Sequence, residues 1–250
     1  MLHLISLTLL ISSCCLHFNR ADMLAEEGQF PFEVSIAYKF KDICGGAIIS
    51  THAIVTAAHC INYIEPNDLQ VFVGVHNFLI FPRGHIHNVA TTKIHPEYEP
   101  TTRDYDVALV KLKESLELNA NVNIIPISST SHVYYGGKQG TLVYWEIENG
   151  SSLLFTQTEL WAEKRCTPAN ALGDFAVDLF DDDLPPSSLA VICVGIPAGL
   201  CIGDDAGSLI VDKELWGIVS MNFECDSKDK PLILTNLAFV KEWIDDNYLN

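Results

Sequence analysis

Short segments rich in apolar, β-branched and aromatic residues recur along almost the whole chain, and they limit the folds that it can adopt. Turn-forming residues bound each segment, and several segments alternate as half-buried strands do. The segments run over 32–40, 46–50, 69–75, 107–112, 141–147, 189–195, 208–211, 215–221 and 232–237. Because few helical patterns lie between them, the sequence predicts an all-β fold built as antiparallel barrels or a sandwich.

The end of the chain shows a different pattern. In 238–249, Phe239, Trp243 and Ile244 recur at spacings that place them on one helical face, with Tyr248 further along it. We therefore expect a C-terminal helix. No repeat, Gly/Ser linker or low-complexity segment interrupts residues 22–250, so we expect this part of the chain to form one domain.

The composition excludes several classes of protein. With 48% hydrophobic and 19% charged residues, the chain has enough apolar material for a core, and most of it is therefore not disordered. Its 32 acidic residues outnumber 15 basic ones, which gives a formal net charge of −17. This charge argues against nucleic acid or an anionic membrane surface as a partner. It is compatible with a basic protein partner.

The first 15 residues, MLHLISLTLLISSCC, form the longest apolar run. The run is too short to span a bilayer, which needs about 20 apolar residues. Polar sequence follows it, so we expect residues 1–15 to be a secretory signal peptide, cleaved at a site up to about residue 20. The mature protein would then be secreted and extracellular, without a membrane span. The stretch 11–14 also resembles a bacterial lipoprotein cleavage site, which is the alternative.

Six cysteines lie beyond that segment, and an even number in an oxidising compartment suggests three disulfides. Spacing alone does not choose among the possible pairings. Zinc is the alternative, but the chain contains no Cys-x-x-Cys pair, so we expect no metal site and no cofactor. The six are Cys44, Cys60, Cys166, Cys193, Cys201 and Cys225.

Three segments carry a resemblance that covers nearly all of residues 22–250. TAAHC (56–60), DYDVALVKL (104–112) and CIGDDAGSLIV (201–211) resemble the His, Asp and Ser segments of the chymotrypsin/trypsin-like serine proteases (peptidase family S1), in that family's order. Supporting matches lie at 26–36, 43–50, 190–195 and 217–220. The resemblance implies two six-stranded antiparallel β-barrels with the cleft between them. It also implies the pairs Cys44–Cys60, Cys166–Cys193 and Cys201–Cys225.

By this resemblance, His59 is the general base and Asp106 the carboxylate that orients it. The nucleophile position departs from the family. Where the family reads Gly-Asp-Ser-Gly-Gly-Pro, residues 203–208 read Gly-Asp-Asp-Ala-Gly-Ser, so Asp205 replaces the serine. A carboxylate has no proton for the base to remove, and it opposes an oxyanion near the Gly203 and Asp205 amides, which resemble the oxyanion hole. Ser208 lies three residues further on, and we do not expect it to substitute.

Two further departures agree with a loss of activity. Family members are activated by cleavage before an Ile-Val-Gly-Gly segment, whose new amine pairs with the acidic residue before the serine, here Asp204. Residues 19–22 read Asn-Arg-Ala-Asp instead. The specificity pocket is also altered, because Asn222 and Leu232 are expected to narrow it unless the loops shift. The positions that match this pocket are Gly199, Ser220, Met221, Asn222 and Leu232.

Two surface features stand outside these motifs. Asn149-Gly150-Ser151 is a sequon in a turn-like stretch, so Asn149 is a predicted N-glycosylation site. The stretch 174–186 is acidic, with three aspartates at 181–183. It is either a solvated loop or a docking site for a basic partner.

The sequence therefore predicts a secreted, monomeric serine protease homologue without catalytic activity. We expect it to bind a protein partner as a decoy or regulator in a proteolytic cascade. This role follows from family analogy, which fold alone does not establish. The alternative is an active trypsin-like serine endopeptidase that uses Asp205 or a recruited serine, as the fold by itself would suggest.

Overall fold

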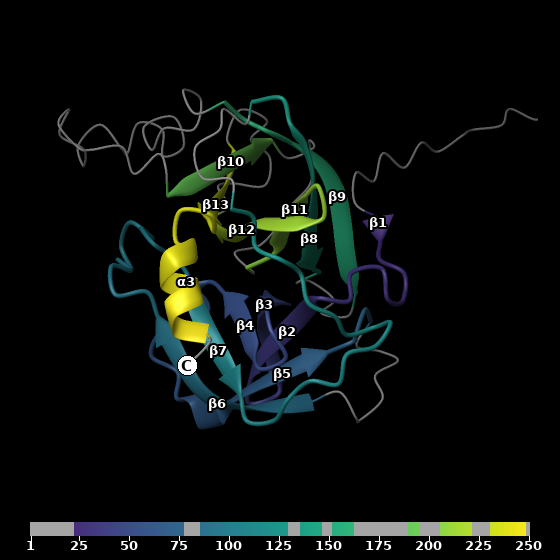
Figure 1. Cartoon of the computed structure of the whole chain (residues 1–250), viewed down its shortest axis with the longest axis vertical. Helices are drawn as coiled ribbons and strands as arrows, with labels where there is room; N and C mark the ends of the chain where they lie inside the picture. The colour runs from purple at the N-terminus through teal and green to yellow at the C-terminus, as the bar shows by residue number, and fades with distance from the viewer. Residues whose placement is uncertain are drawn as a thin grey trace, which may run out of the picture.

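The computed structural model describes residues 23–77, 86–129, 136–146, 152–162, 190–195, 206–221 and 231–248. Within these ranges the chain forms two antiparallel β-barrels, one from each half of the sequence (Figure 1). The two-barrel fold expected from the resemblance is thus confirmed.

The first barrel closes in the order β2-β3-β4-β7-β6-β5. Its interior is filled by apolar side chains, and β2, β4 and β5 are almost entirely buried. The strands are β2 (Glu33–Tyr38), β3 (Lys41–Ile48), β4 (Ala53–Thr56), β5 (Leu69–Val73), β6 (Ile86–Ile94) and β7 (Ala108–Leu112).

The second barrel closes in the order β9-β10-β13-β12-β11-β8, because β8 also pairs with β9. A short strand near the start of the described chain, β1 (Met23–Leu24), pairs with β9 from outside this ring. The barrel strands are β8 (Gln139–Trp145), β9 (Leu153–Leu160), β10 (Val191–Gly195), β11 (Ser208–Val211), β12 (Glu214–Met221) and β13 (Leu232–Asn236).

Three helical elements lie outside the sheets in the part of the chain that the structure describes. The one-turn helix α1 (Ala58–Ile61) directly follows β4, and η1 (Pro66–Asp68) leads into β5. The C-terminal helix α3 (Lys241–Tyr248) lies beside the first barrel at β7 (Figure 1). It begins later than residue 238, so Phe239 precedes the helix rather than sharing its face, and Ile244 is the residue that α3 buries.

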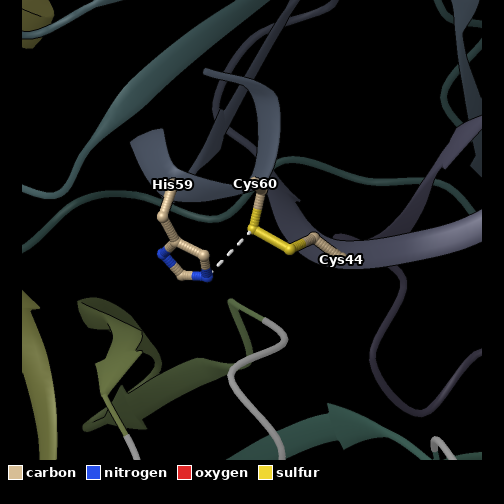
Figure 2. A group of neighbouring side chains, drawn as sticks. All are labelled: Cys44, His59 and Cys60. Carbon is tan, nitrogen blue, oxygen red and sulfur yellow. Dashed lines mark hydrogen bonds between the residues drawn. A yellow bond between two sulfur atoms is a disulfide. The ribbon is translucent and has the colours of Figure 1, made fainter. Parts of the chain in front are cut away.

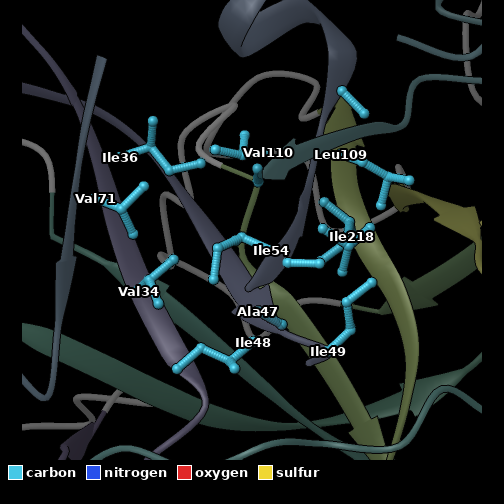
Figure 3. Close-up of a cluster of buried hydrophobic side chains, with 14 of the residues drawn as sticks. Val34, Ile36, Ala47, Ile48, Ile49, Ile54, Val71, Leu109, Val110 and Ile218 are labelled. Carbon is cyan, nitrogen blue, oxygen red and sulfur yellow. The ribbon is translucent and has the colours of Figure 1, made fainter. Parts of the chain in front are cut away.

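One apolar cluster spans both barrels. Ile218 of β12 lies among first-barrel side chains such as Ile54 and Val110, as Figure 3 shows. Leu215 and Ile244 belong to the same cluster. A second cluster, with Leu142, Leu209 and Trp216 among its members, fills the second barrel. Because the shared core fixes one barrel against the other, side chains at their boundary are held in register.

No helix among the residues that the structure describes is long and apolar enough to cross a membrane.

Candidate active site

His59 and Asp106 meet because two neighbouring strands of the first barrel place them together. Strands β4 and β7 pair with Thr56 opposite Ala108, so the turn after β4 lies beside the residues before β7. His59 Nδ1 is 2.6 Å from Asp106 Oδ2, and the His59 backbone N–H donates to Asp106 Oδ1 at 2.9 Å. Two contacts to one carboxylate fix both the position and the tilt of the imidazole.

The second barrel holds the same aspartate. Ser220 of β12 donates its hydroxyl to Asp106 Oδ2 at 2.6 Å, and Thr235 of β13 donates to the Asp106 carbonyl at 2.8 Å. The side chain of Asp106 is completely buried. A buried carboxylate is stable only when donors surround it, and here the donors come from both barrels. Ser220, which matches the specificity pocket in sequence, therefore also positions Asp106.

A disulfide lies against the other edge of the imidazole. Cys60 Sγ is 3.5 Å from His59 Nε2, and Cys60 is bonded to Cys44 (Figure 2). The Cys44–Cys60 pair implied by the resemblance is confirmed. These three side chains form a compact His/Cys group, but both sulfurs belong to the disulfide and are not free thiolates for a metal ion.

Arg103 spans the boundary between the barrels beside this pair. Its Nη1 donates to the backbone carbonyl of Ser220, at the point where the pairing of β12 and β13 shifts register. Arg103 has a left-handed backbone, with φ of 58°, and its N–H donates to the Glu99 carbonyl at 2.7 Å. A left-handed non-glycine residue costs about 1–2 kcal/mol. The loop before Asp106 therefore holds Arg103 against the second barrel at a local energetic cost.

Tyr98 lies in the same loop and interacts electrostatically with Asp106. Burial, and then the Asp106 carboxylate, raise the pKa of Tyr98 to about 12, while Arg103 opposes the shift. Its hydroxyl is therefore neutral at physiological pH and serves as a hydrogen-bonding group rather than a base.

Ser208 is completely buried and donates its hydroxyl to Glu33 Oε2 at 2.6 Å. Burial raises the pKa of Glu33 well above its ordinary value, and hydrogen bonds from Ser208 and the Gly46 amide offset only part of that effect. The Ser208 hydroxyl thus faces a carboxyl of β2, in the contact between the barrels.

The turn into β11 contains a strained residue. Ala206 is fully buried and has φ of 53°, the left-handed conformation that glycine adopts most easily. Gly207 follows, and a side chain there would meet the Val143 carbonyl oxygen at 2.7 Å. Ala206 and Gly207, which lead into β11, are therefore two positions at which few other residues would fit.

Two residues matched to the specificity pocket are described besides Ser220. Met221 packs against Cys193 and Ile233, and Leu232 is fully buried in the core of the second barrel. Cys193 also takes part in a disulfide. Other predicted residues lie outside the described residues: the signal segment 1–15, the segment 19–22, Asn149, Cys166, the acidic stretch 174–186, Gly199, Cys201, Gly203, Asp204, Asp205, Asn222 and Cys225.

Two antiparallel barrels with a His–Asp pair at their junction, its aspartate fully buried, are the features of the serine protease class. The Trypsin family model matches residues 23–244, and the chain belongs to this family.

Curated relatives agree with this assignment. Hypodermin-B of Hypoderma lineatum is 31% identical over 234 residues, covering 89% of this chain and 84% of the relative. Trypsin iota of Drosophila melanogaster is 28% identical over 220 residues, covering 86% and 82%. A trypsin of Phaedon cochleariae is 26% identical over 220 residues, covering 87% and 83%.

Sequence reasoning overlooked Arg103 and Glu33. Arg103 lies three residues before Asp106, but its contact with Ser220 depends on a loop conformation that no motif encodes. Glu33 did leave a signal, since it is the one acidic residue of the apolar segment 32–40. A charge in such a segment calls for a buried partner.

Proposed function

We propose that the protein is a secreted serine protease homologue that binds a protein partner without cleaving it, as a decoy or regulator of a proteolytic cascade. The observation that carries the proposal is Asp205, which occupies the nucleophile position in the sequence. A carboxylate cannot be activated by proton removal as a serine can. Loss of the triad nucleophile typically lowers the rate on the order of a million-fold.

The surroundings of the His–Asp pair support this proposal. Two described serines already donate to carboxyl groups, Ser208 to Glu33 and Ser220 to Asp106. Recruiting Ser208 would mean extracting a buried hydroxyl from the barrel interface. Arg103 adds a second obstacle, because a peptide that paired with the Ser220 carbonyl would have to displace its guanidinium.

The alternative function is an active serine endopeptidase. It is favoured by the short His59–Asp106 contact and by the names of the relatives, which are those of proteases. A His–Asp pair without a hydroxyl nucleophile supplies a base but no attacking group. We therefore prefer the binding role.

The remaining parts of the proposal concern the mature protein. Residues 1–15 are removed as a signal peptide, and 22–250 form the two-barrel domain as a monomer. Asp204 lacks its usual amine partner, and the specificity pocket is narrowed. The proposed disulfides beyond the confirmed pair are Cys166–Cys193 and Cys201–Cys225, and the proposed glycosylation site is Asn149.

A serine-directed fluorophosphonate probe tests the absence of catalysis. The full chain is secreted from insect cells, purified and incubated with the probe beside an active trypsin. We expect labelling of trypsin alone, and no cleavage of a mixed peptide library by our protein. Covalent labelling of the pure protein at any serine would overturn the proposal.

The same preparation tests its secretion and assembly. Terminal sequencing is expected to place the new N-terminus after residue 15, at or before about residue 20. Light scattering is expected to give the mass of one glycosylated chain. Retention of the full N-terminus inside the cell would contradict secretion, and a dimer mass would contradict the monomer.

A further inference from the structure

A pocket of about 360 Å³ opens between the loop that begins at His95 and helix α3. It contains neither His59 nor Asp106. The residues of interest on its wall are His95, Glu97, Tyr105, Phe239, Glu242 and Trp243. We call it the aromatic–acid pocket. Its volume is at the lower end for small-molecule sites, which suits a single side chain better than a cofactor.

Aromatic rings build one side of the pocket. The His95 ring stacks on Tyr105 with 4.8 Å between centroids and 10° between planes, and its centroid lies 4.7 Å from that of Trp243. Phe239 extends the wall at 6.1 Å from Tyr105 and is 36% exposed. The exposed Phe239 ring beside the tilted Tyr105 ring offers an apolar face to a ligand.

His95 offers this pocket a hydrogen-bond donor. The residue is only 8% exposed, and its Nδ1 accepts the Glu97 N–H at 3.2 Å. Burial lowers the pKa of His95, and the charge of Glu97 opposes this only in part. The ring is therefore neutral at physiological pH, with its proton on Nε2. Nε2 has no partner among the described residues, and the ring lines the pocket.

The rim of the pocket is acidic. Exposed carboxylates of Glu97, Glu242 and Asp246 line it. Of the described cations nearby, Lys241 is paired with Asp245 at 2.6 Å, and Lys93 donates to Asn247 at the edge of the pocket. The described residues that line the pocket thus include three carboxylates and no lysine or arginine.

We propose that the aromatic–acid pocket docks an arginine side chain from a basic segment of a protein partner. A guanidinium is planar and weakly hydrated, so it stacks on aromatic rings while its fork of N–H groups pairs with carboxylates. The His95 Nε2–H can donate to a backbone carbonyl of the same segment. A lysine ammonium lacks the flat face that stacking needs. The net charge of −17 would attract a basic segment from a distance.

Titration with short peptides tests the proposal. Peptides Gly-Gly-X-Gly-Gly, with X as arginine, lysine or citrulline, are added to the full mature protein. Trp243 emission and the His95 ring resonances are followed. We expect saturable binding of the arginine peptide with a Kd on the order of 1 mM. The lysine peptide should bind several-fold more weakly, and citrulline should not saturate.

Variants locate the binding. The double variant Glu97→Gln, Glu242→Gln is expected to weaken the arginine peptide about tenfold, and Phe239→Ala several-fold. The control Glu114→Gln, Glu117→Gln removes the same charge from exposed positions elsewhere, and it should leave the affinity unchanged. If both double variants weaken arginine binding equally, the binding depends on net charge alone, and the proposed pocket is refuted. Equal binding of all three peptides, or none, would also overturn the proposal.

The outcome is independent of catalysis. Probe labelling with normal arginine binding would refute the binding-only role and leave the docking site intact. Absence of labelling together with absence of arginine binding would refute the docking site and leave the lack of catalysis intact.

Discussion

The Ser208 hydroxyl donates to Glu33 Oε2 at 2.6 Å, and this contact joins strand β11 of the second barrel to strand β2 of the first. Both side chains are fully buried or nearly so. The contact commits Ser208 to the interface between barrels and places a titratable group in the interior.

Glu33→Gln is expected to change how stability depends on pH. The folded protein raises the pKa of Glu33 well above 4.5, so the folded state binds this proton more tightly than the unfolded chain. The stability that Glu33 contributes is therefore complete below about pH 4.5 and is lost as pH rises towards the raised pKa. Glutamine does not titrate. The stability of the variant relative to the native protein should thus increase with pH, by at most about 1.4 kcal/mol per pH unit.

Urea unfolding from pH 4 to pH 8 measures this difference. Glu214→Gln, which replaces a half-buried glutamate at the start of β12, serves as a control. A pH-independent difference between Glu33→Gln and the native protein would show that Glu33 does not titrate as its burial demands.

Asp205→Ser alone is expected not to restore peptide cleavage. Residues 19–22 do not carry the family's activation sequence, and the function proposed above includes a narrowed specificity pocket, so a serine at position 205 would replace only one of three missing features. Arg103 would still occupy the Ser220 carbonyl. Turnover of chromogenic peptides with arginine, lysine, phenylalanine or alanine at the cleaved position should stay at background. Appreciable turnover by this single variant would show that the nucleophile is the main defect.

Ala206→Gly and Ala108→Gly form a matched pair of substitutions, since both alanines are fully buried. Each change removes a buried methyl group and adds freedom to the unfolded chain. Only Ala206 is relieved of a left-handed conformation, which is worth about 1–2 kcal/mol. In chemical unfolding, Ala206→Gly should therefore lower the free energy of unfolding by less than Ala108→Gly does, with a difference of about 1 kcal/mol or more. Equal losses would mean that the turn into β11 is unstrained.

Replacing Cys44 and Cys60 by serine is expected to lower the free energy of unfolding by about 3 kcal/mol, because the disulfide closes a loop of 16 residues. Thermal unfolding of the oxidised native protein and of the double variant gives the comparison. The single variant Cys44→Ser distinguishes loss of the crosslink from loss of sulfur packing beside His59. A loss below about 1 kcal/mol in the double variant would contradict the estimate.

The apolar strands could be predicted, because burial leaves a pattern in the chain. Segments 32–40 and 107–112 contain β2 and β7, and the TAAHC and DYDVALVKL segments point to His59 and Asp106. Strands β6 and β9, like the short strands β1 and β4, lie outside the apolar segments identified in the sequence. In β6 only Val89 is buried, and β9 buries Thr156 and Thr158, so neither strand shows a simple apolar alternation.

The contacts between distant loops could not be predicted. Arg103 reaches Ser220 only because its loop adopts a left-handed turn, and His95 meets Trp243 only because α3 folds back onto the first barrel. Such contacts join residues far apart in the chain, and neither spacing nor composition records them. The disulfide Cys44–Cys60 came from the family resemblance, since spacing left the pairing open.

The way Asp106 is held changes what an intact His–Asp pair can tell an investigator. Its carboxylate and carbonyl accept hydrogen bonds from His59, Ser220 and Thr235, which tie α1 to β12 and β13. Removing this carboxylate would leave the His59 and Ser220 donors without an acceptor, whether or not the protein is catalytic. A two-barrel chain needs the pair for its structure whether or not it cleaves peptides. In a two-barrel protein the retained pair is therefore a poor diagnostic of activity, and the identity of the nucleophile is the better one.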